Sequence, residues 1–271
     1  MQRAFTRWIF GALGFVVLCG AIAFFTLPLK GQIPILAYHF VVPREQVGPT
    51  SLDVSQESFE HQMRFLQTFR FRPISLRELY EIKRGAKQPK GREIVITFDD
   101  GNRSYVEFAL PILSRYGFPS ANFLIWDNIT QELHGSMDLE MVRRIAHDPL
   151  VTFGSHTLSH PVLSKVDPEQ ARQEIVQSRA RFEQLLDKKI DFFAYPEGAF
   201  DDAAIKFVQE AGYLLAFTTS WKHLAGKNRE TLYTLTRTKV TSSDNLLSFW
   251  MRVSGISSYV KRLRYAYGFW S

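Results

Sequence analysis

Short apolar runs alternate with amphipathic segments along most of the chain. Runs rich in β-branched and aromatic residues predict strands at 33–42, 71–74, 93–98, 120–126, 150–154, 191–195, 213–218 and 232–240. Between them, apolar residues spaced three and four positions apart predict helices after Ser55, from Ser75, and over 103–116, 138–147, 168–187, 201–211 and 244–252. Repeated strand–helix units of this kind predict a parallel sheet covered by helices.

The number of these units favours a closed or nearly closed barrel over an open sheet. We therefore predict an α/β fold, a distorted (β/α)7–8 barrel. Polar motifs follow the predicted strands directly, which places them at the C-terminal mouth, where barrel enzymes build their active sites. The chain carries neither a Gly-x-Gly-x-x-Gly nor a P-loop sequence, so a nucleotide-binding fold is not indicated.

The first part of the chain predicts a membrane anchor. Residues 8–29 contain no charged residue, Arg3 and Arg7 precede them, and Lys30 follows. About 20 apolar residues span a bilayer as a helix, and the basic flank favours a cytoplasmic N-terminus with the rest of the chain outside. The alternative is a cleaved signal peptide with a small-residue cleavage signal at Ala21-Ile22-Ala23. In both cases the remaining chain is exported, to the periplasm or the outside of the cell.

Composition narrows the class of partner. The chain has 271 residues and a formal charge of +6, but its basic residues are dispersed and form no nucleic-acid-binding motif. We expect no nucleic-acid partner, and a membrane surface or an anionic wall polymer suits the charge better. The only cysteine, Cys19, lies in the apolar segment, so the exported part has no disulfide and no thiol nucleophile. We divide the chain into 1–31 (stub, anchor and link) and one domain, 32–271; no pattern indicates an oligomeric state.

Two motifs carry candidate chemistry. Thr97-Phe98-Asp99-Asp100-Gly101 places two carboxylates where a strand ends, and Ser155–Pro161 supplies His156 and His160. One Asp with two His is a common metal-binding set, and the second Asp is then a candidate base. Considered alone, the Asp pair could cap a helix and the His pair could lie on the surface.

A third stretch, Phe193-Ala194-Tyr195-Pro196-Glu197-Gly198, follows another predicted strand. Together the three stretches resemble the NodB-homology polysaccharide deacetylases, carbohydrate esterase family 4. Leu36-Ala37-Tyr38-His39 is similar to the branch that contains exopolysaccharide N-deacetylases. The resemblance implies the barrel of that family, with a divalent metal, usually Zn²⁺, held by Asp100, His156 and His160. It also implies Asp99 as general base.

The third motif departs from the family, which has an aromatic residue where this chain has Glu197. In the family, the backbone N–H at that position stabilises the oxyanion, which any residue except proline can offer. Tyr195, Pro196, Glu197 and Gly198 are therefore the candidate substrate and oxyanion segment. An inward carboxylate would repel the developing negative charge, so we expect Glu197 to point to solvent or toward a cationic substrate amine.

Three further residues are weaker candidates. His39 ends the first predicted strand and resembles a Tyr-His pair of the branch, which makes it a candidate site residue without a fixed role. Arg237 resembles an arginine of the branch, and we expect it either to pair with Asp99 and orient it or to form a structural ion pair. The family's Leu-x-His motif, the source of its general acid, has no clear counterpart; His223 lies in a late loop.

These features predict metal-dependent hydrolysis of N-acetyl groups from GlcNAc-type units of a cell-surface or exported polysaccharide, with release of acetate. One alternative is an O-acetyl esterase with the same fold. Another is a glycan-binding protein without activity, which the change at Glu197 and the missing Leu-x-His favour and the intact motifs oppose.

Overall fold

The computed structural model describes residues 33–48, 52–220, 230–257 and 260–261. The expected membrane anchor at 8–29 lies outside these residues, as do Cys19 and His223. Within the described ranges, no helix is both long and apolar enough to cross a membrane.

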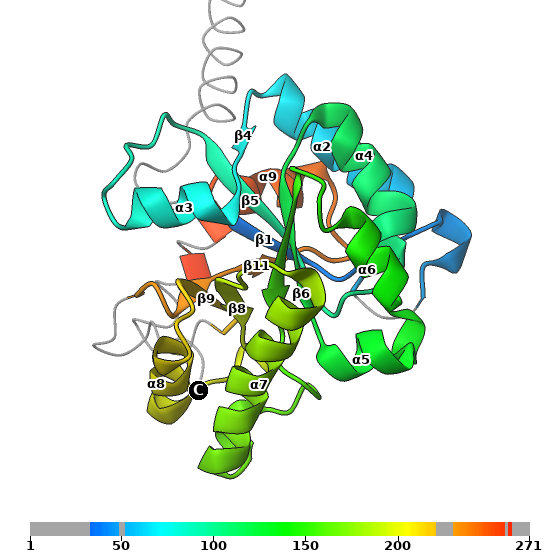
Figure 1. The fold of residues 1–271 in the computed structure, drawn as a ribbon. Helices are drawn as coiled ribbons and strands as arrows, with labels where there is room; N and C mark the ends of the chain where they lie inside the picture. The colour runs from blue at the N-terminus through cyan, green and yellow to red at the C-terminus, as the bar shows by residue number, and fades with distance from the viewer. Residues whose placement is uncertain (1–32, 49–51, 221–229, 258–259, 262–271) are drawn as a thin grey trace, which may run out of the picture.

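Parallel strands form a nearly closed barrel with helices around it (Figure 1). Its strand order is β10-β9-β8-β7-β6-β5-β1-β11. These strands are β1 (Ile35–Tyr38), β5 (Glu93–Phe98), β6 (Ser120–Leu124), β7 (Val151–Ser155), β8 (Phe192–Ala194), β9 (Leu215–Thr218), β10 (Leu235–Thr236) and β11 (Thr238–Lys239). Since one residue separates β10 from β11, the last stretch of chain pairs with β9 at one edge and with β1 at the other. The predicted barrel class is confirmed.

The remaining elements lie around and beside the barrel. The helices are α2 (Gln56–Thr68), α3 (Leu76–Lys83), α4 (Leu110–Tyr116), α5 (Trp126–Gln131), α6 (Leu139–Ile145), α7 (Pro168–Leu186), α8 (Asp202–Glu210) and α9 (Leu246–Val253). Shorter elements are β2 (Phe40–Val42), η1 (Arg44–Gln46), β3 (Asp53–Ser55), β4 (Arg72–Pro73), η2 (Tyr105–Ala109), η3 (Leu133–Gly135), η4 (Leu163–Lys165) and η5 (Pro196–Gly198). Ser55 and Ser75 cap α2 and α3, because their side chains accept hydrogen bonds from the N–H groups of Ser58 and Glu78.

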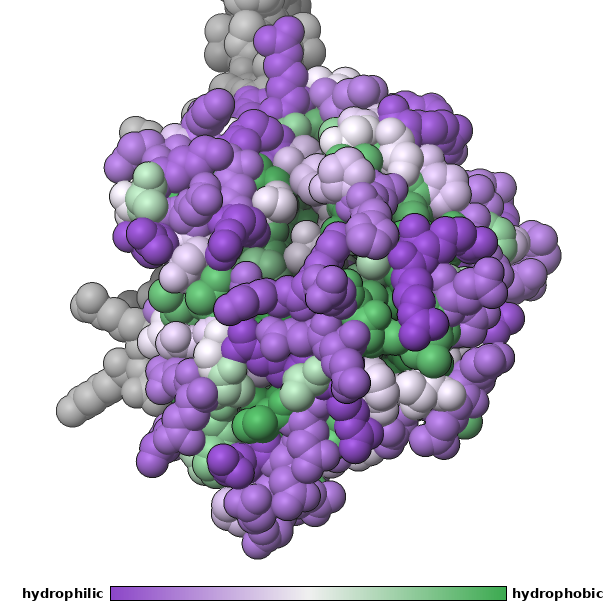
Figure 2. Space-filling view, in the orientation of Figure 1, coloured by the Kyte–Doolittle hydropathy of each residue, from purple (hydrophilic) through white to green (hydrophobic). Residues whose placement is uncertain are grey.

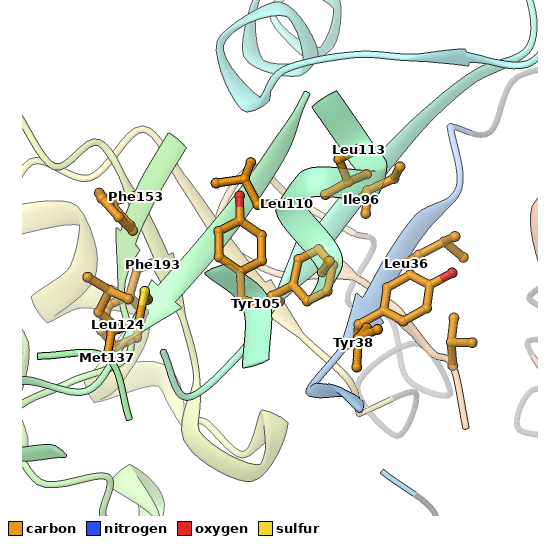
Figure 3. Close-up of a cluster of buried hydrophobic side chains, with 14 of the residues drawn as sticks. Leu36, Tyr38, Ile96, Tyr105, Leu110, Leu113, Leu124, Met137, Phe153 and Phe193 are labelled. Atoms are coloured by element: carbon orange, nitrogen blue, oxygen red, sulfur yellow. The ribbon is translucent and has the colours of Figure 1, made fainter. Parts of the chain in front are cut away.

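Two apolar layers stabilise this arrangement. Successive side chains of a strand point to opposite faces, so Ala121 and Phe123 of β6 pack inside the barrel while Leu124 packs against the helices. Figure 3 shows part of the outer layer, with Tyr105 and Leu110 next to side chains of the central strands. Hydrophilic side chains cover most of the face shown in Figure 2, and hydrophobic ones are visible between them.

Four predicted elements differ from the structure, and each difference has a local cause. The strand at 33–42 is broken at His39, because β2 leaves the barrel to pair with β3 in a separate sheet. The strand at 232–240 is broken at Arg237, where its partner changes from β9 to β1. The strand at 120–126 ends at Leu124, and Trp126 instead begins α5.

The predicted helix 103–116 begins with a wider turn, η2. There the N–H of Leu110 donates to the carbonyl of Tyr105, five residues earlier. The next residue, Pro111, has no N–H, so the regular pattern of hydrogen bonds cannot continue through it and the wider turn takes up the mismatch.

Candidate metal centre and catalytic pocket

Asp99 and Asp100 follow β5 directly, and their side chains have different partners. The N–H of Asp99 donates to the carbonyl of Tyr38 at 3.0 Å, so Asp99 still follows the sheet. Asp100 and Gly101 then both adopt positive φ, at 69° and 68°, and turn the chain. A Cβ on Gly101 would lie 2.9 Å from Leu124 Cδ2, so glycine is required both for the turn and for the close contact.

The loop after β7 brings two imidazoles to the same point. The N–H of His156 donates to the carbonyl of Leu124 at 2.8 Å, and its Nδ1 lies 2.7 Å from the carbonyl oxygen of Ala194. Since a carbonyl only accepts, Nδ1 carries the proton and Nε2 presents a lone pair. Thr157 Oγ1 accepts from the N–H of His160 at 2.9 Å, which turns His160 back toward His156.

Asp100, His156 and His160 converge with the spacing of a metal site. The two Nε2 atoms are 3.1 Å apart, and Oδ1 of Asp100 is 3.8 Å from Nε2 of His156 and 4.0 Å from Nε2 of His160. A point equidistant from these atoms lies about 2.1 Å from each, which matches the roughly 2.0–2.2 Å bonds of zinc to imidazole nitrogen and carboxylate oxygen. The three residues therefore fit a divalent cation without rearrangement.

The electrostatics of the cluster also suit a cation. Burial lowers the pKa of His156 to about 3 and lowers that of His160, so both imidazoles are neutral and their free nitrogens could bind a cation. Burial, with repulsion from Asp99 and Glu197, raises the pKa of Asp100 to about 6. The positive charges of His39 and Arg237 lower this pKa but do not offset those effects, and a bound cation would stabilise the ionised carboxylate further.

Asp99 is paired with the cationic side chain of Arg237. Arg237 donates from Nη1 to Oδ1 at 2.6 Å and from Nη2 to Oδ2 at 2.8 Å, and both side chains are buried. Burial alone would raise the pKa of Asp99, but the positive charge and hydrogen bonds of Arg237 lower it well below its usual range. Asp99 is therefore an ionised carboxylate, and the expected pairing with Arg237 is present.

A pocket of about 120 Å³ gathers the predicted site residues. Its lining includes His39, Asp99, Asp100, His156, His160, Tyr195, Glu197, Gly198 and Arg237. His39 comes from the break between β1 and β2, is 9% exposed, and its Nδ1 has no hydrogen-bond partner among the described residues. Of the segment after β8, Pro196 is buried and does not line the pocket. Lys239 also lines it and was not predicted.

The turn after β8 forms one wall of this pocket. The N–H groups of Gly198 and Ala199 close the turn on Tyr195 and Pro196, and Glu197 has φ 56°. Glu197 is an exposed residue that also lines the pocket, and its charge acts on Asp100 and His160, so the expectation that its side chain points to solvent stays a prediction. A Cβ on Gly198 would lie 2.5 Å from Thr219 Oγ1, so this position cannot accept a larger residue without movement.

One residue that sequence analysis missed supports the histidine loop. Glu174, on α7, accepts from the N–H groups of Leu158 and Ser159 at 2.8 and 2.9 Å and from Ser159 Oγ at 2.6 Å. Glu174 is 6% exposed, and its carboxylate holds the segment between the two histidines in place. A charged residue on the buried face of α7, beside Ala171 and Ile175, was the signal that could have identified it.

Comparison with known proteins finds a matching family model, related sequences and similar folds. Residues 86–216 match the family model described as polysaccharide deacetylase. The putative polysaccharide deacetylase YxkH of Bacillus subtilis is 25% identical over 233 residues, which cover 86% of this chain and 77% of YxkH. The poly-beta-1,6-N-acetyl-D-glucosamine N-deacetylase of Staphylococcus aureus is 27% identical over 180 residues, which cover 62% of each protein.

Two solved structures share the fold. The deacetylase PplD of Streptococcus pyogenes superposes with a TM-score of 0.71 at 22% identity, covering 83% of this chain and 99% of PplD. IcaB of Ammonifex degensii gives a TM-score of 0.69 at 21% identity, covering 84% of this chain and 97% of IcaB.

Proposed function

Because the chain belongs to the NodB-type polysaccharide deacetylases, we propose that it hydrolyses the acetamide of GlcNAc-type units in a cell-surface or exported polysaccharide. The reaction releases acetate and leaves a free amine on the sugar. One observation carries the proposal: a metal-type cluster and a separate, ionised carboxylate share one pocket. A fold retained only for glycan binding would not require both.

The metal assignment follows from the donor set. Asp100, His156 and His160 would hold a divalent cation, and zinc suits two imidazoles and one carboxylate with positions left open. When bound, the cation supplies Lewis-acid polarisation of the acetyl carbonyl and lowers the pKa of water.

Two side chains of the protein carry out the two proton transfers of this reaction. Asp99 accepts the proton of the water that attacks the acetyl carbon, and Arg237 holds its carboxylate ionised and in one orientation. The N–H of Glu197 is the donor that we assign to the oxygen of the tetrahedral intermediate. His39 lines the same pocket and is the imidazole that we assign to protonate the departing amine nitrogen.

The staphylococcal relative is named for poly-beta-1,6-N-acetyl-D-glucosamine, and we propose a polymer of this class as the substrate. The test is acetate release by the full-length chain from a panel of N-acetylated and O-acetylated glycans, with and without a chelator. We expect chelator-sensitive release from N-acetylated polymers and its loss in Asp99→Asn. Release from O-acetylated glycans alone would identify an esterase, and binding without release would identify a glycan-binding protein.

The location that we propose is the outer side of a membrane, with the chain anchored through residues 8–29. The uncharged segment and its basic N-terminal flank support this topology. A protease added outside the inner membrane should cleave a protease-sensitive tag on the C-terminus of the chain while that membrane is intact. A tag that is protected until the inner membrane is broken would contradict export.

A further inference from the structure

Although basic residues occur throughout the chain, the net charge of the catalytic domain is divided unevenly. Residues 69–93, which run from the C-terminus of α2 to the start of β5, contain eight Lys or Arg and three Glu. The other residues between 33 and 256 contain 19 Lys or Arg and 24 Asp or Glu. The segment 69–93 therefore carries a formal charge of +5, whereas the rest of this range carries −5.

Two of the three acidic side chains in this segment are paired within it. Glu78 contacts Lys87 and Arg72 at 2.7 and 2.9 Å, and Arg72 also contacts Glu93 at 2.7 Å. Three exposed cations of the segment form no ion pair with any residue that the structure describes: Arg70, Arg84 and Lys90. Their positive charge is therefore available to a partner outside the domain.

These cations lie at the end of the barrel opposite to the catalytic mouth. Arg70 lies between α2 and β4, and Arg84 and Lys90 lie on the connection between α3 and β5. The two connections are joined, because the N–H of Arg72 donates to the carbonyl of Arg92 at 2.8 Å. Figure 1 shows α3 and β4 toward one end of the barrel and α5 toward the other. We call the surface formed by these two connections the basic face.

The chain enters the barrel beside the basic face. Pro34, just before β1, accepts a hydrogen bond from the N–H of Val95 at 2.9 Å, so β1 starts next to the start of β5. Five residues lie between the uncharged segment 8–29 and Ile35, and five residues span at most about 18 Å when fully extended. With residues 8–29 in a bilayer, this end of the barrel is the part of the domain nearest to the membrane.

We propose that the basic face docks on the anionic surface of the membrane in which residues 8–29 anchor the chain. Each Lys or Arg close to an anionic leaflet strengthens such a contact about 5-fold. The short link makes the contact intramolecular, so a few cations suffice to hold it. The acidic remainder of the domain is repelled by the same surface, which favours one orientation. The inference rests on the proposed location and is independent of the reaction.

Docking on the basic face directs the catalytic pocket away from the membrane. β5 begins at Glu93, next to this face, and ends at Phe98, and Asp99 and Asp100 follow it at the mouth. The six residues of β5 span roughly 20 Å. The pocket is then held about this far from the bilayer, where it meets an exported polymer rather than a sugar carried on a membrane lipid.

The test measures how close each end of the barrel lies to lipid, using the full-length chain in nanodiscs. In a Cys19→Ser background, a fluorescent probe is attached at Gln88→Cys, on the α3–β5 connection, or at Gln131→Cys, an exposed position on the mouth side. Labelled lipid head groups quench a probe that lies near the bilayer. We expect the Gln88 probe to be quenched about 3-fold more in discs containing phosphatidylglycerol than in discs of phosphatidylcholine. The difference should vanish in about 1 M salt, where the Debye length is about 3 Å, and the Gln131 probe should not distinguish the lipids.

Charge variants separate the docking from the reaction. Arg84→Gln/Lys90→Gln removes two free cations of the basic face and should abolish most of the lipid-dependent quenching of the Gln88 probe. Lys165→Gln/Arg172→Gln removes two exposed cations on the mouth side and is the matched control, which should leave that quenching unchanged. Neither change touches the pocket, so both variants should release acetate from soluble oligomers within about 2-fold of the wild-type rate.

Equal quenching of the Gln88 probe in the two lipids would overturn the docking, and so would equal losses in the two charge variants. Binding of a soluble polyphosphate polymer to the basic face, without a response to either lipid, would assign this face to a wall polymer instead. A full-length chain that does not enter the discs would overturn the docking together with the proposed anchor. Lipid-dependent quenching in a protein that releases no acetate would support the docking, and only the proposed reaction would fail.

Discussion

Arg237 holds both carboxylate oxygens of Asp99, at 2.6 and 2.8 Å, across 138 positions of sequence. Arg237 is the single residue between β10 and β11, and its backbone N–H donates to the carbonyl of Thr218 at 2.8 Å. Its guanidinium lies over the ring of Phe123, with Cζ 5.1 Å from the centroid. The closure of the barrel and the orientation of the candidate base therefore depend on the same residue.

Arg237→Lys should lower activity and shift its pH dependence. A lysine cannot reproduce the two parallel hydrogen bonds, so we expect kcat/KM to fall about 10–100-fold through loss of orientation. Arg237 also favours the ionised form of Asp99, so weakening that contact raises the pKa of the carboxyl group. The acid limb of the kcat/KM profile should then move to higher pH, and an unmoved limb would contradict this role.

Metal analysis should distinguish the role of Asp99 from that of Asp100, although the two residues are adjacent in the sequence. Asp99→Asn should keep the metal and lose about 10²–10⁴-fold in kcat, because only the base is removed. Asp100→Asn and His156→Ala should lose bound metal, since each removes one donor of the set. Elemental analysis after dialysis measures this, and full metal content in His156→Ala would remove that residue from the ligand set.

Glu174→Gln should weaken metal binding without a contact to the metal. The loss of charge-assisted hydrogen bonds loosens the loop between His156 and His160, and outer-shell changes of this kind typically cost about 10–100-fold in metal affinity. Competition with a chelator measures the affinity. Gln173→Ala, exposed on the same helix, is the control, and equal affinities in the two variants would show that Glu174 only stabilises the fold.

Much of the fold could be predicted because buried parallel strands are continuous apolar runs and barrel sites follow strand ends. Asp99, Asp100 and His156 were recognisable for this reason, because they are polar residues just after such a run, and His160 follows His156 by four positions in the same motif. The breaks at His39 and Arg237 were not predictable from local pattern, because they arise where a strand changes partners during closure.

The start of α5 was missed for a different reason. The apolar run continues through Ile125 and Trp126, and hydrophobicity alone does not distinguish a strand end from a buried helix start. The chain turns there because Trp126 and Asp127 bond to the histidine loop, which is distant in sequence. Asn128 and His134 line a space next to Asp100 and His160, and no sequence pattern indicated that they lie there.

The opposite end of β5 supports a prediction about stability. Glu93 is 4% exposed and accepts from Arg72 Nη2 at 2.7 Å and from the N–H groups of Lys90 and Gly91. Burial alone would raise the pKa of Glu93, but the bonds from Arg72 and the backbone lower it below its usual value. The ionised form of Glu93 is thus favoured by folding.

Glu93→Gln should therefore lower the free energy of unfolding at pH 7 by about 1.5–3 kcal/mol, the usual contribution of hydrogen bonds to a charged group. Because the folded pKa is the lower one, this contribution is complete above the unfolded value of about 4.3 and is lost as pH falls through the folded pKa. Urea denaturation from pH 7 to pH 3 should show the two proteins converging at acid pH. Glu140→Gln, on an exposed position, should change stability by less than about 0.5 kcal/mol at every pH. A constant difference between wild type and Glu93→Gln across this range would mean that the charge of Glu93 does not carry the stabilisation.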